Sequence, residues 1–212
     1  MTLPAAWPGS LAAGIILCAL LSGALSSVLA WQAWQAGVPP DLRQDEALVA
    51  AQGLVQLICA VLTLIWLPLG IRRVQHAGAA DLSVGPAGSV LWWFVPVANL
   101  VMPAKAVAEL RKAALNPGDW QAVGGSPLIA SWWTCWILAG LAGVASWRAT
   151  VSEEEELRQF AGGATFAADL LSAPAALLFA LVVLQIGRHL QNLPEADRRP
   201  GSLAVEGGTA GR

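Results

Sequence analysis

Asp169 is the acidic residue that lies well inside a long apolar stretch, and it is the first candidate for chemistry in this chain. A carboxylate within a membrane-spanning helix is costly, and such residues often handle protons or ions. A structural role is the alternative, because Asp169 lies about one and a half turns from the end of the apolar stretch 164–187. It can reach the membrane interface there, and Thr165 and Ser172 are close enough in sequence to hydrogen-bond it. The sequence leaves both roles open.

Two glutamines in another apolar stretch form the second candidate group. Gln52 and Gln56 are four residues apart, so they share one face of a helix. They can hydrogen-bond a neighbouring helix, which contributes about 0.6 kcal/mol per bond within membranes. Lining a pore is the other role open to them. The pattern favours packing between helices.

A proline-broken segment over residues 90–115 contains the remaining candidates, which are Trp93, Pro96, Asn99, Pro103 and Glu109. Pro96 removes an amide donor and interrupts a helix, whereas Pro103 suits the first turn of a new helix. Carbonyls freed between the two prolines need donors, and the Asn99 amide can supply them. Contact with a ligand or a lipid headgroup is the alternative for Asn99.

The chain shows no catalytic or metal-binding pattern. Its two histidines, His76 and His189, stand outside any metal-protease frame, and no nucleophile-elbow or phosphate-loop motif occurs. The three cysteines are Cys18, Cys59 and Cys135, all in apolar runs and not at metal-ligand spacing, which is typical of small buried hydrophobic residues. We therefore predict no catalytic residue, no metal and no cofactor, and a protein that is not an enzyme.

The composition indicates an integral membrane protein. Of the 212 residues, 56% are hydrophobic and 12% are charged, and the mean hydropathy is +0.59. A soluble domain usually has about 25% charged residues. The net charge of −2, without a dense run of Lys or Arg, excludes nucleic acid as a partner.

The long apolar stretches predict an all-α polytopic fold with four transmembrane helices. About 20 helical residues cross a hydrocarbon core of about 30 Å, and the predicted spans are residues 11–31, 47–70, 127–147 and 164–187. The broken part, 90–103, is too short to cross, so we expect it to be re-entrant or interfacial before it continues into an amphipathic helix. We predict one membrane domain over residues 1–193 and a disordered cytoplasmic tail over residues 194–212.

Positive charge predicts the orientation. The five Lys and Arg residues between the second and third spans are Arg72, Arg73, Lys105, Arg111 and Lys112. Basic residues concentrate on the cytoplasmic side, so we expect this connection and both termini in the cytoplasm. Because basic residues flank the broken segment on both sides, the segment must return to the side it left. The same cations can attract anionic lipid.

The broken segment carries a family resemblance. Residues 93–100 read Trp-Phe-Val-Pro-Val-Ala-Asn-Leu, and Pro103, Val107 and the pair Glu109-Leu110 follow. This pattern resembles a bacterial membrane family defined as the domain of unknown function numbered 4328, with spans of similar number and order over roughly residues 11–193. Where members of that family carry an aromatic residue and a Trp, this chain has Ala104 and Arg111. The resemblance implies a multi-pass bacterial membrane protein and no reaction.

Two functional hypotheses follow. The first is a multi-pass protein of the bacterial inner membrane that acts through protein or lipid contacts at the inner leaflet. Its partners are membrane lipids and either a second copy of the chain or another membrane protein. The alternative is a small oligomeric transporter or channel-like protein that uses Asp169, the half-helix at Asn99, or the Gln52 and Gln56 face.

Overall fold

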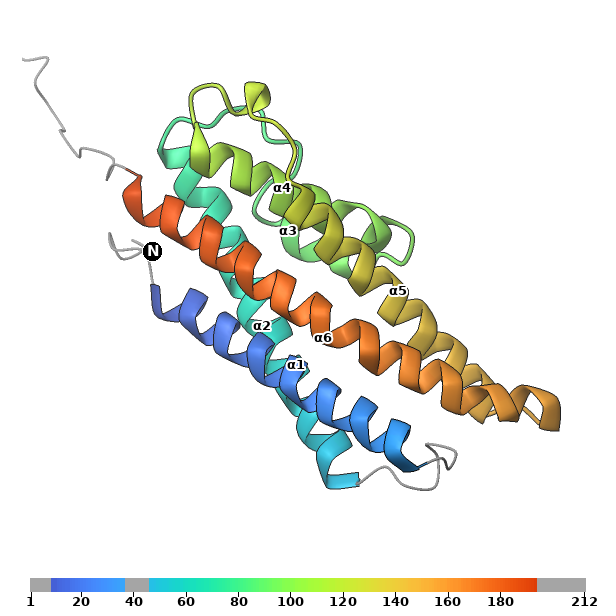
Figure 1. Ribbon diagram of the computed structural model, residues 1–212. Helices are drawn as coiled ribbons and strands as arrows, with labels where there is room; N and C mark the ends of the chain where they lie inside the picture. Colours follow the sequence, from blue (N-terminus) through green and yellow to red (C-terminus); the bar gives the residue numbers. More distant parts are fainter. Residues whose placement is uncertain (1–8, 37–45, 194–212) are drawn as a thin grey trace, which may run out of the picture.

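Four long helices dominate the computed structural model, which describes residues 9–36 and 46–193 (Figure 1). They are α1 (Gly9–Ala36), α2 (Glu46–His76), α5 (Pro127–Thr150) and α6 (Glu155–Asn192). Each contains one predicted span and is long and apolar enough to cross a membrane. The described residues contain helices and no strand, which confirms the predicted all-α class. The predicted tail, 194–212, lies outside the described residues.

The helices extend beyond the predicted spans, most of all in α6. The acidic run Glu153–Glu156 continues into the helix, which begins at Glu155. Glu155 and Glu156 lie in its first turn, where negative charge is favoured by the helix dipole. Asp169 therefore lies about four turns inside the helix. The helices are longer than the predicted spans because they continue beyond the apolar residues into the polar region.

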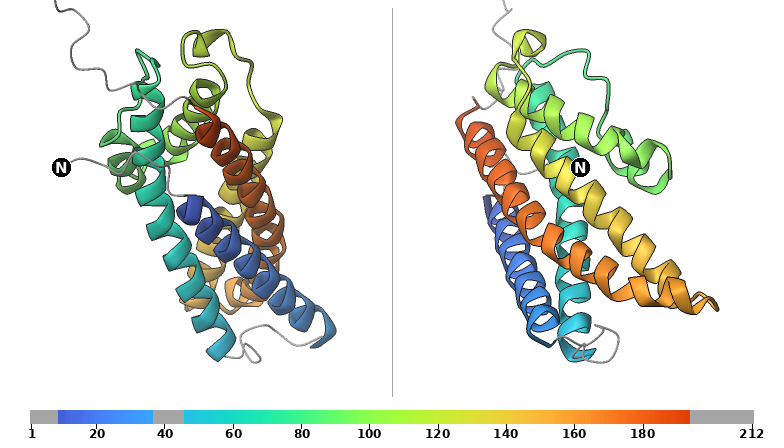
Figure 2. Two further views of the ribbon diagram at one scale, coloured as in Figure 1. Left: turned by 90° about the vertical axis from the view of Figure 1, so that its left-hand side faces the viewer. Right: turned by 45° about the vertical axis from the view of Figure 1, so that its right-hand side comes forward.

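α6 is the central helix of the bundle, and it packs along both α1 and α5 (Figure 2). α1 also packs against α2. Small residues allow the close approach of α1 and α6: a Cβ atom on Gly23 would lie 3.3 Å from the Cβ of Ala176 and 3.4 Å from the carbonyl oxygen of Ala173. Close approach through small residues is typical of helices that pack within membranes.

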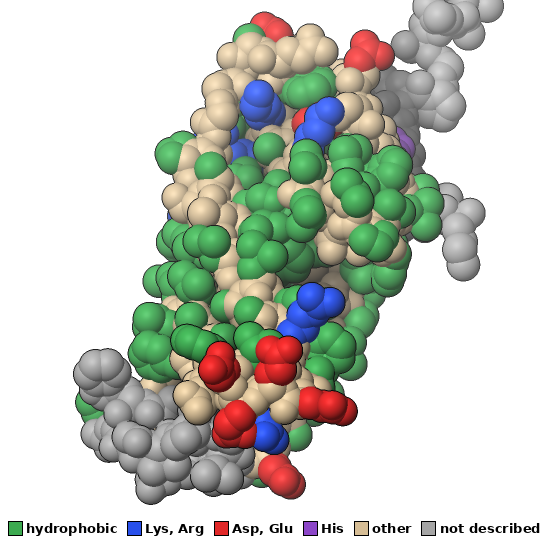
Figure 3. Space-filling view, turned by 90° about the vertical axis from the view of Figure 1, so that its right-hand side faces the viewer, with side chains coloured by type: hydrophobic (Ala, Val, Ile, Leu, Met, Phe, Trp, Pro, Cys, Tyr) green, Lys and Arg blue, Asp and Glu red, His purple; other side chains and the backbone are tan. Residues whose placement is uncertain are grey.

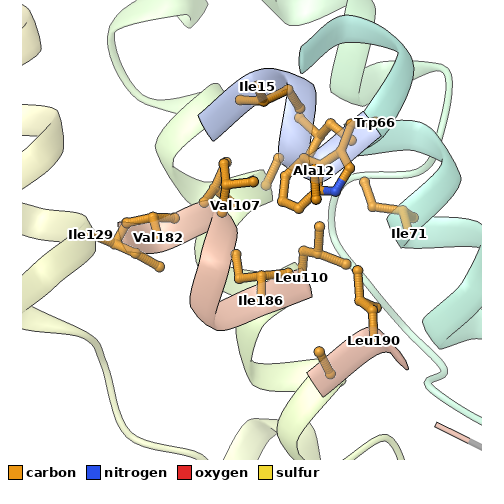
Figure 4. Close-up of a cluster of buried hydrophobic side chains, with 14 of the residues drawn as sticks. Ala12, Ile15, Trp66, Ile71, Val107, Leu110, Ile129, Val182, Ile186 and Leu190 are labelled. Atoms are coloured by element: carbon orange, nitrogen blue, oxygen red, sulfur yellow. The ribbon is translucent and has the colours of Figure 1, made fainter. Parts of the chain in front are cut away.

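The helix α4 (Met102–Leu115) packs across one end of the bundle. Val107, Leu110 and Ala114 form its apolar face and are buried, as its sequence predicts. They join side chains of α1, α2, α5 and α6 in a shared core (Figure 4). At Gly70 of α2 a Cβ atom would lie 2.9 Å from a methyl group of the buried Leu110, so a larger residue there would displace the Leu110 side chain.

A bent segment precedes α4, and we call residues 88–101 the elbow. It comprises the short helix α3 (Gly88–Leu91) and the 3₁₀ turns η2 (Trp92–Phe94) and η3 (Ala98–Leu100). Pro96 lies in the turn between η2 and η3, which is closed by the amide of Asn99 donating to the Val95 carbonyl at 2.7 Å. Pro103 lies in the first turn of α4, as predicted. A further 3₁₀ turn, η4 (Trp120–Ala122), lies between α4 and α5.

Candidate functional site

The elbow exposes a surface of large apolar side chains. Phe94 is 70% exposed and Val97 is 80% exposed. The other members of this surface are Leu91, Val95, Leu100 and Val101. Figure 3 shows the corresponding face, on which hydrophobic side chains are widespread and acidic side chains gather at the far end. A contiguous exposed apolar patch usually marks a membrane or protein contact.

A cluster of indole rings holds the other side of the elbow against α5. The ring of Trp93 lies edge-on to Trp133 and Trp136, with centroids 6.3 and 5.9 Å apart. Trp133 and Trp136 are stacked at 4.7 Å. The structure thus places two tryptophans of α5 in contact with Trp93. Such ring pairs add about 0.5–1.5 kcal/mol each beyond burial.

Trp133 supplies the hydrogen bond that we expected from Asn99. Its indole N–H donates to the Leu100 carbonyl at 3.0 Å. The Asn99 side chain makes no hydrogen bond to any described residue, and its Oδ1 atom is buried without a donor. The prediction for Asn99 was therefore wrong, because the donor comes from another helix. The signal in the sequence was an indole pair near a helix start, since a buried Trp N–H usually has an acceptor.

Glu109 fastens the loop that leads into the elbow. Its side chain is buried, and one carboxylate oxygen accepts the Ser83 amide at 3.0 Å and the Val84 amide at 3.4 Å. The other oxygen accepts the Ser83 hydroxyl. Lys105 forms the expected pair one turn away, with its Nζ atom 4.0 Å from Glu109. Glu109 thus positions the segment between α2 and the elbow.

Two of the five basic residues between the second and third predicted spans are used inside the protein. Arg73 donates to the carbonyls of Leu190 and Leu193 at 2.7 and 3.3 Å. These carbonyls belong to the end of α6, where the last turn has no helical donors. Arg111 donates to Gln185 Oε1 at 3.2 Å and to a loop carbonyl. The remaining cations, Arg72, Lys105 and Lys112, are the ones available to lipid.

The two glutamines of α2 have different environments. Gln52 is buried, and its amide nitrogen donates to the Ser26 hydroxyl of α1 at 2.7 Å. Gln56 is exposed. The structure thus gives Gln52 the packing contact that the spacing favoured. Gln56 makes no such contact with the described residues.

The Asp169 side chain makes no hydrogen bond or ion pair with any described residue. The expected partners are engaged elsewhere: Thr165 donates to the Ala161 carbonyl at 3.0 Å, and Ser172 donates to the Ala168 carbonyl at 2.8 Å. Hydroxyl groups within a helix often bond the carbonyl four residues earlier, which explains why this prediction was wrong. Asp169 lies one turn before Ala173, so it is on the side of α6 that faces α1.

Asn99 and Asp169 lie at different levels of the bundle. Contacts between Trp132 and Phe179 and between Ser146 and Thr165 fix the register of α5 and α6. In that register Asp169 lies opposite residue 142 of α5. The elbow is held at Trp133, which is about 13 Å away along the helix. One copy of the chain therefore does not combine Asn99 and Asp169 in a single site.

The fold and the exposed elbow define a class of protein. Four candidate spans indicate a multi-pass membrane protein. Among the described residues, no group of three or more His, Cys, Asp or Glu side chains is placed to hold a metal ion.

A protein-family model matches this chain. The family model named Domain of unknown function (DUF4328) matches residues 39–188, so the chain belongs to this family. The match confirms the resemblance carried by the elbow and covers α2 through most of α6. Comparisons with curated proteins and with solved structures found no match.

Proposed function

We propose that this chain is a non-enzymatic multi-pass membrane protein whose elbow enters one leaflet and acts there through contacts with lipid and neighbouring membrane proteins. The observation that carries the proposal is the exposed apolar surface of the elbow, of which Phe94 and Val97 are the most exposed members. An apolar surface of this kind, attached to candidate spans, is stable in a hydrocarbon environment and costly in water.

The contacts on the other side of the elbow also support its insertion into a leaflet. Irregular backbone within a membrane is tolerated only where protein satisfies its polar groups. Trp133 satisfies the Leu100 carbonyl, and Glu109 satisfies the amides of Ser83 and Val84. The Leu100 carbonyl of the elbow and the loop before the elbow are thus bonded from within the protein, while the large apolar side chains of the elbow are exposed.

The distribution of charged residues favours the cytoplasmic leaflet. The described residues at the α4 end include six Lys and Arg side chains: Arg72, Arg73, Lys105, Arg111, Lys112 and Arg188. The opposite end, where α5 is followed by α6, instead carries the acidic run Glu153–Glu156. The positive-inside rule favours the α4 end in the cytoplasm. We propose that the elbow enters the cytoplasmic leaflet of a bacterial inner membrane.

Depth-dependent quenching tests this proposal. A fluorophore is attached at Val97→Cys in a variant in which Cys18, Cys59 and Cys135 are replaced by Ala, and the protein is reconstituted in bilayers of brominated lipid. We expect strong quenching at Val97. A label at Gln121→Cys, on the exposed turn η4, is the control and should stay bright. Equal brightness at both positions would rule out insertion of the elbow.

A topology reporter tests the orientation separately. Ala79 and Gln121 flank the elbow and α4 in sequence, so both are expected in the cytoplasm. Reporters placed at the two positions should give the same side in intact cells. Opposite sides would mean that the elbow and α4 cross the membrane, which contradicts the four-span topology.

Transport is the second candidate function, and Asp169 is the observation that favours it. Its carboxylate lies in a candidate span on the side facing α1, and no described residue pairs with it. An unpaired intramembrane carboxylate is suited to binding a proton or a cation. Liposomes containing the wild-type protein would then show ion flux that Asp169→Asn abolishes. Flux equal to that of empty liposomes would exclude this function.

A further inference from the structure

We infer that the outer face of α4 is a binding site for the phosphate headgroup of an anionic phospholipid, with Lys105 and Lys112 as its cations. This inference deepens the proposed function and rests on it, because the elbow must reach the leaflet for α4 to meet headgroups. Both lysines of the chain are in α4.

The two lysines lie on one side of α4. They are seven residues apart, which is close to two helical turns, so they are aligned along one side of the helix. The opposite side is formed by the buried residues Val107, Leu110 and Ala114. The Lys105 side chain is 49% exposed. The lysine side therefore faces away from the core.

The apolar surface of the elbow continues into this cationic face. Val101, which is 62% exposed, lies four residues before Lys105 and so just beneath it on the same side. A surface that changes from apolar to cationic over one turn complements a lipid, whose acyl chains adjoin its phosphate. A soluble anion would match the lysines and leave the apolar part unpaired, which is why we assign a phospholipid.

The acidic neighbours leave the lysines available. The Glu109 side chain is only 10% exposed and is directed toward Ser83, so its contact with Lys105 is a long one of 4.0 Å. The Lys112 side chain makes no ion pair or hydrogen bond with any described residue. Arg73 and Arg111, by contrast, donate to groups of the protein. Tertiary contacts thus distinguish Arg73 and Arg111, which are bonded within the protein, from the two lysines.

Lysine is suited to this task because its flexible apolar stem lies along the helix while the ammonium group reaches the headgroup. A basic residue near an anionic membrane surface increases binding by about fivefold. We expect the wild-type protein to retain phosphatidylglycerol in preference to phosphatidylcholine when both are present in equal amounts.

Native mass spectrometry of protein extracted from vesicles of equal phosphatidylglycerol and phosphatidylcholine tests the site. Lys105→Gln/Lys112→Gln should lower the preference for phosphatidylglycerol at least fivefold, and Lys105→Arg/Lys112→Arg should retain it. Arg148→Gln/Arg158→Gln removes the same charge at the acidic end and should have no effect. An unchanged preference in the double Gln variant would overturn the inference. An equal loss in the Arg148→Gln/Arg158→Gln variant would also overturn it, because net charge would then be the cause.

Reductive methylation provides an independent readout, because these are the two lysines of the chain. We expect slower methylation of Lys105 and Lys112 in phosphatidylglycerol vesicles than in phosphatidylcholine vesicles, and equal rates would count against a headgroup contact. The quenching experiment at Val97 distinguishes failure of the headgroup site from failure of the proposed function. Quenching without lipid preference refutes the headgroup site alone, whereas absence of quenching refutes the proposed function itself.

Discussion

The two ends of the bundle are stabilised in different ways. At the α4 end, side chains join segments far apart in the sequence: Arg73 reaches Leu190, and Trp133 reaches Leu100. At the acidic end most side-chain bonds are local, such as that between Thr150 and Ser146. The contact between Ser146 and Thr165 joins neighbouring helices across a short connection.

This difference arises because irregular backbone needs specific donors and acceptors from other segments. Regular helices satisfy their own backbone groups, so the acidic end needs few long-range bonds. The elbow and the loop before it cannot satisfy theirs, so the α4 end recruits Glu109, Arg73 and Trp133. Substitutions at these three residues should therefore cost more stability than polar substitutions at the acidic end.

Glu109→Ala should have the largest effect, a loss of about 3 kcal/mol, because the amides of Ser83 and Val84 and the Ser83 hydroxyl lose a charged acceptor. Thermal unfolding in detergent, followed by circular dichroism, measures it. Glu153→Ala, at an exposed position of the acidic end, is the control and should change stability by less than about 0.5 kcal/mol. Equal effects of the two substitutions would remove the contrast between the ends.

Arg73→Met should cost about 2 kcal/mol, because two carbonyls at the end of α6 lose their donor. Its neighbour Arg72 is exposed, so Arg72→Met is a control with the same change in charge. Hydrogen exchange near residue 190 should accelerate in the first variant only. Similar exchange in both variants would show that Arg73 contributes charge and not a hydrogen bond.

Trp133→Phe should cost about 1 kcal/mol, because the ring is kept and the hydrogen bond to the Leu100 carbonyl is lost. We expect faster hydrogen exchange over residues 97–101 with little change elsewhere. Trp147→Phe is the matched control, since Trp147 is 63% exposed. Unchanged exchange in the elbow would mean that ring packing alone holds it.

Gln52→Leu should have the smallest effect, about 0.6 kcal/mol, the typical value for a bond between helices in a membrane. A double-mutant cycle with Ser26→Ala measures the coupling directly. Gln56→Leu is the control, because Gln56 is exposed. A coupling as large as the effect at Glu109 would contradict the ranking of the two ends.

The periodic features were predictable from the sequence. The four long helices, the helix start at Pro103 and the buried face of Val107 and Leu110 follow from apolar length, proline chemistry and helical spacing. The partners of single polar groups were not predictable. Asn99 and Asp169 lack the hydrogen bonds expected of them, because the available donors were already engaged or came from another helix.

The sequence by itself determined the class of molecule, since apolar length and the position of charge depend only on local composition. Tertiary structure alone decided which cations face outward. Arg73 and Arg111 look like Lys105 and Lys112 in the sequence, yet they donate to the end of α6 and to Gln185. The physical reason is that a hydrogen bond depends on the position of both partners in space. Helical spacing gives the direction of one partner and leaves the other undetermined.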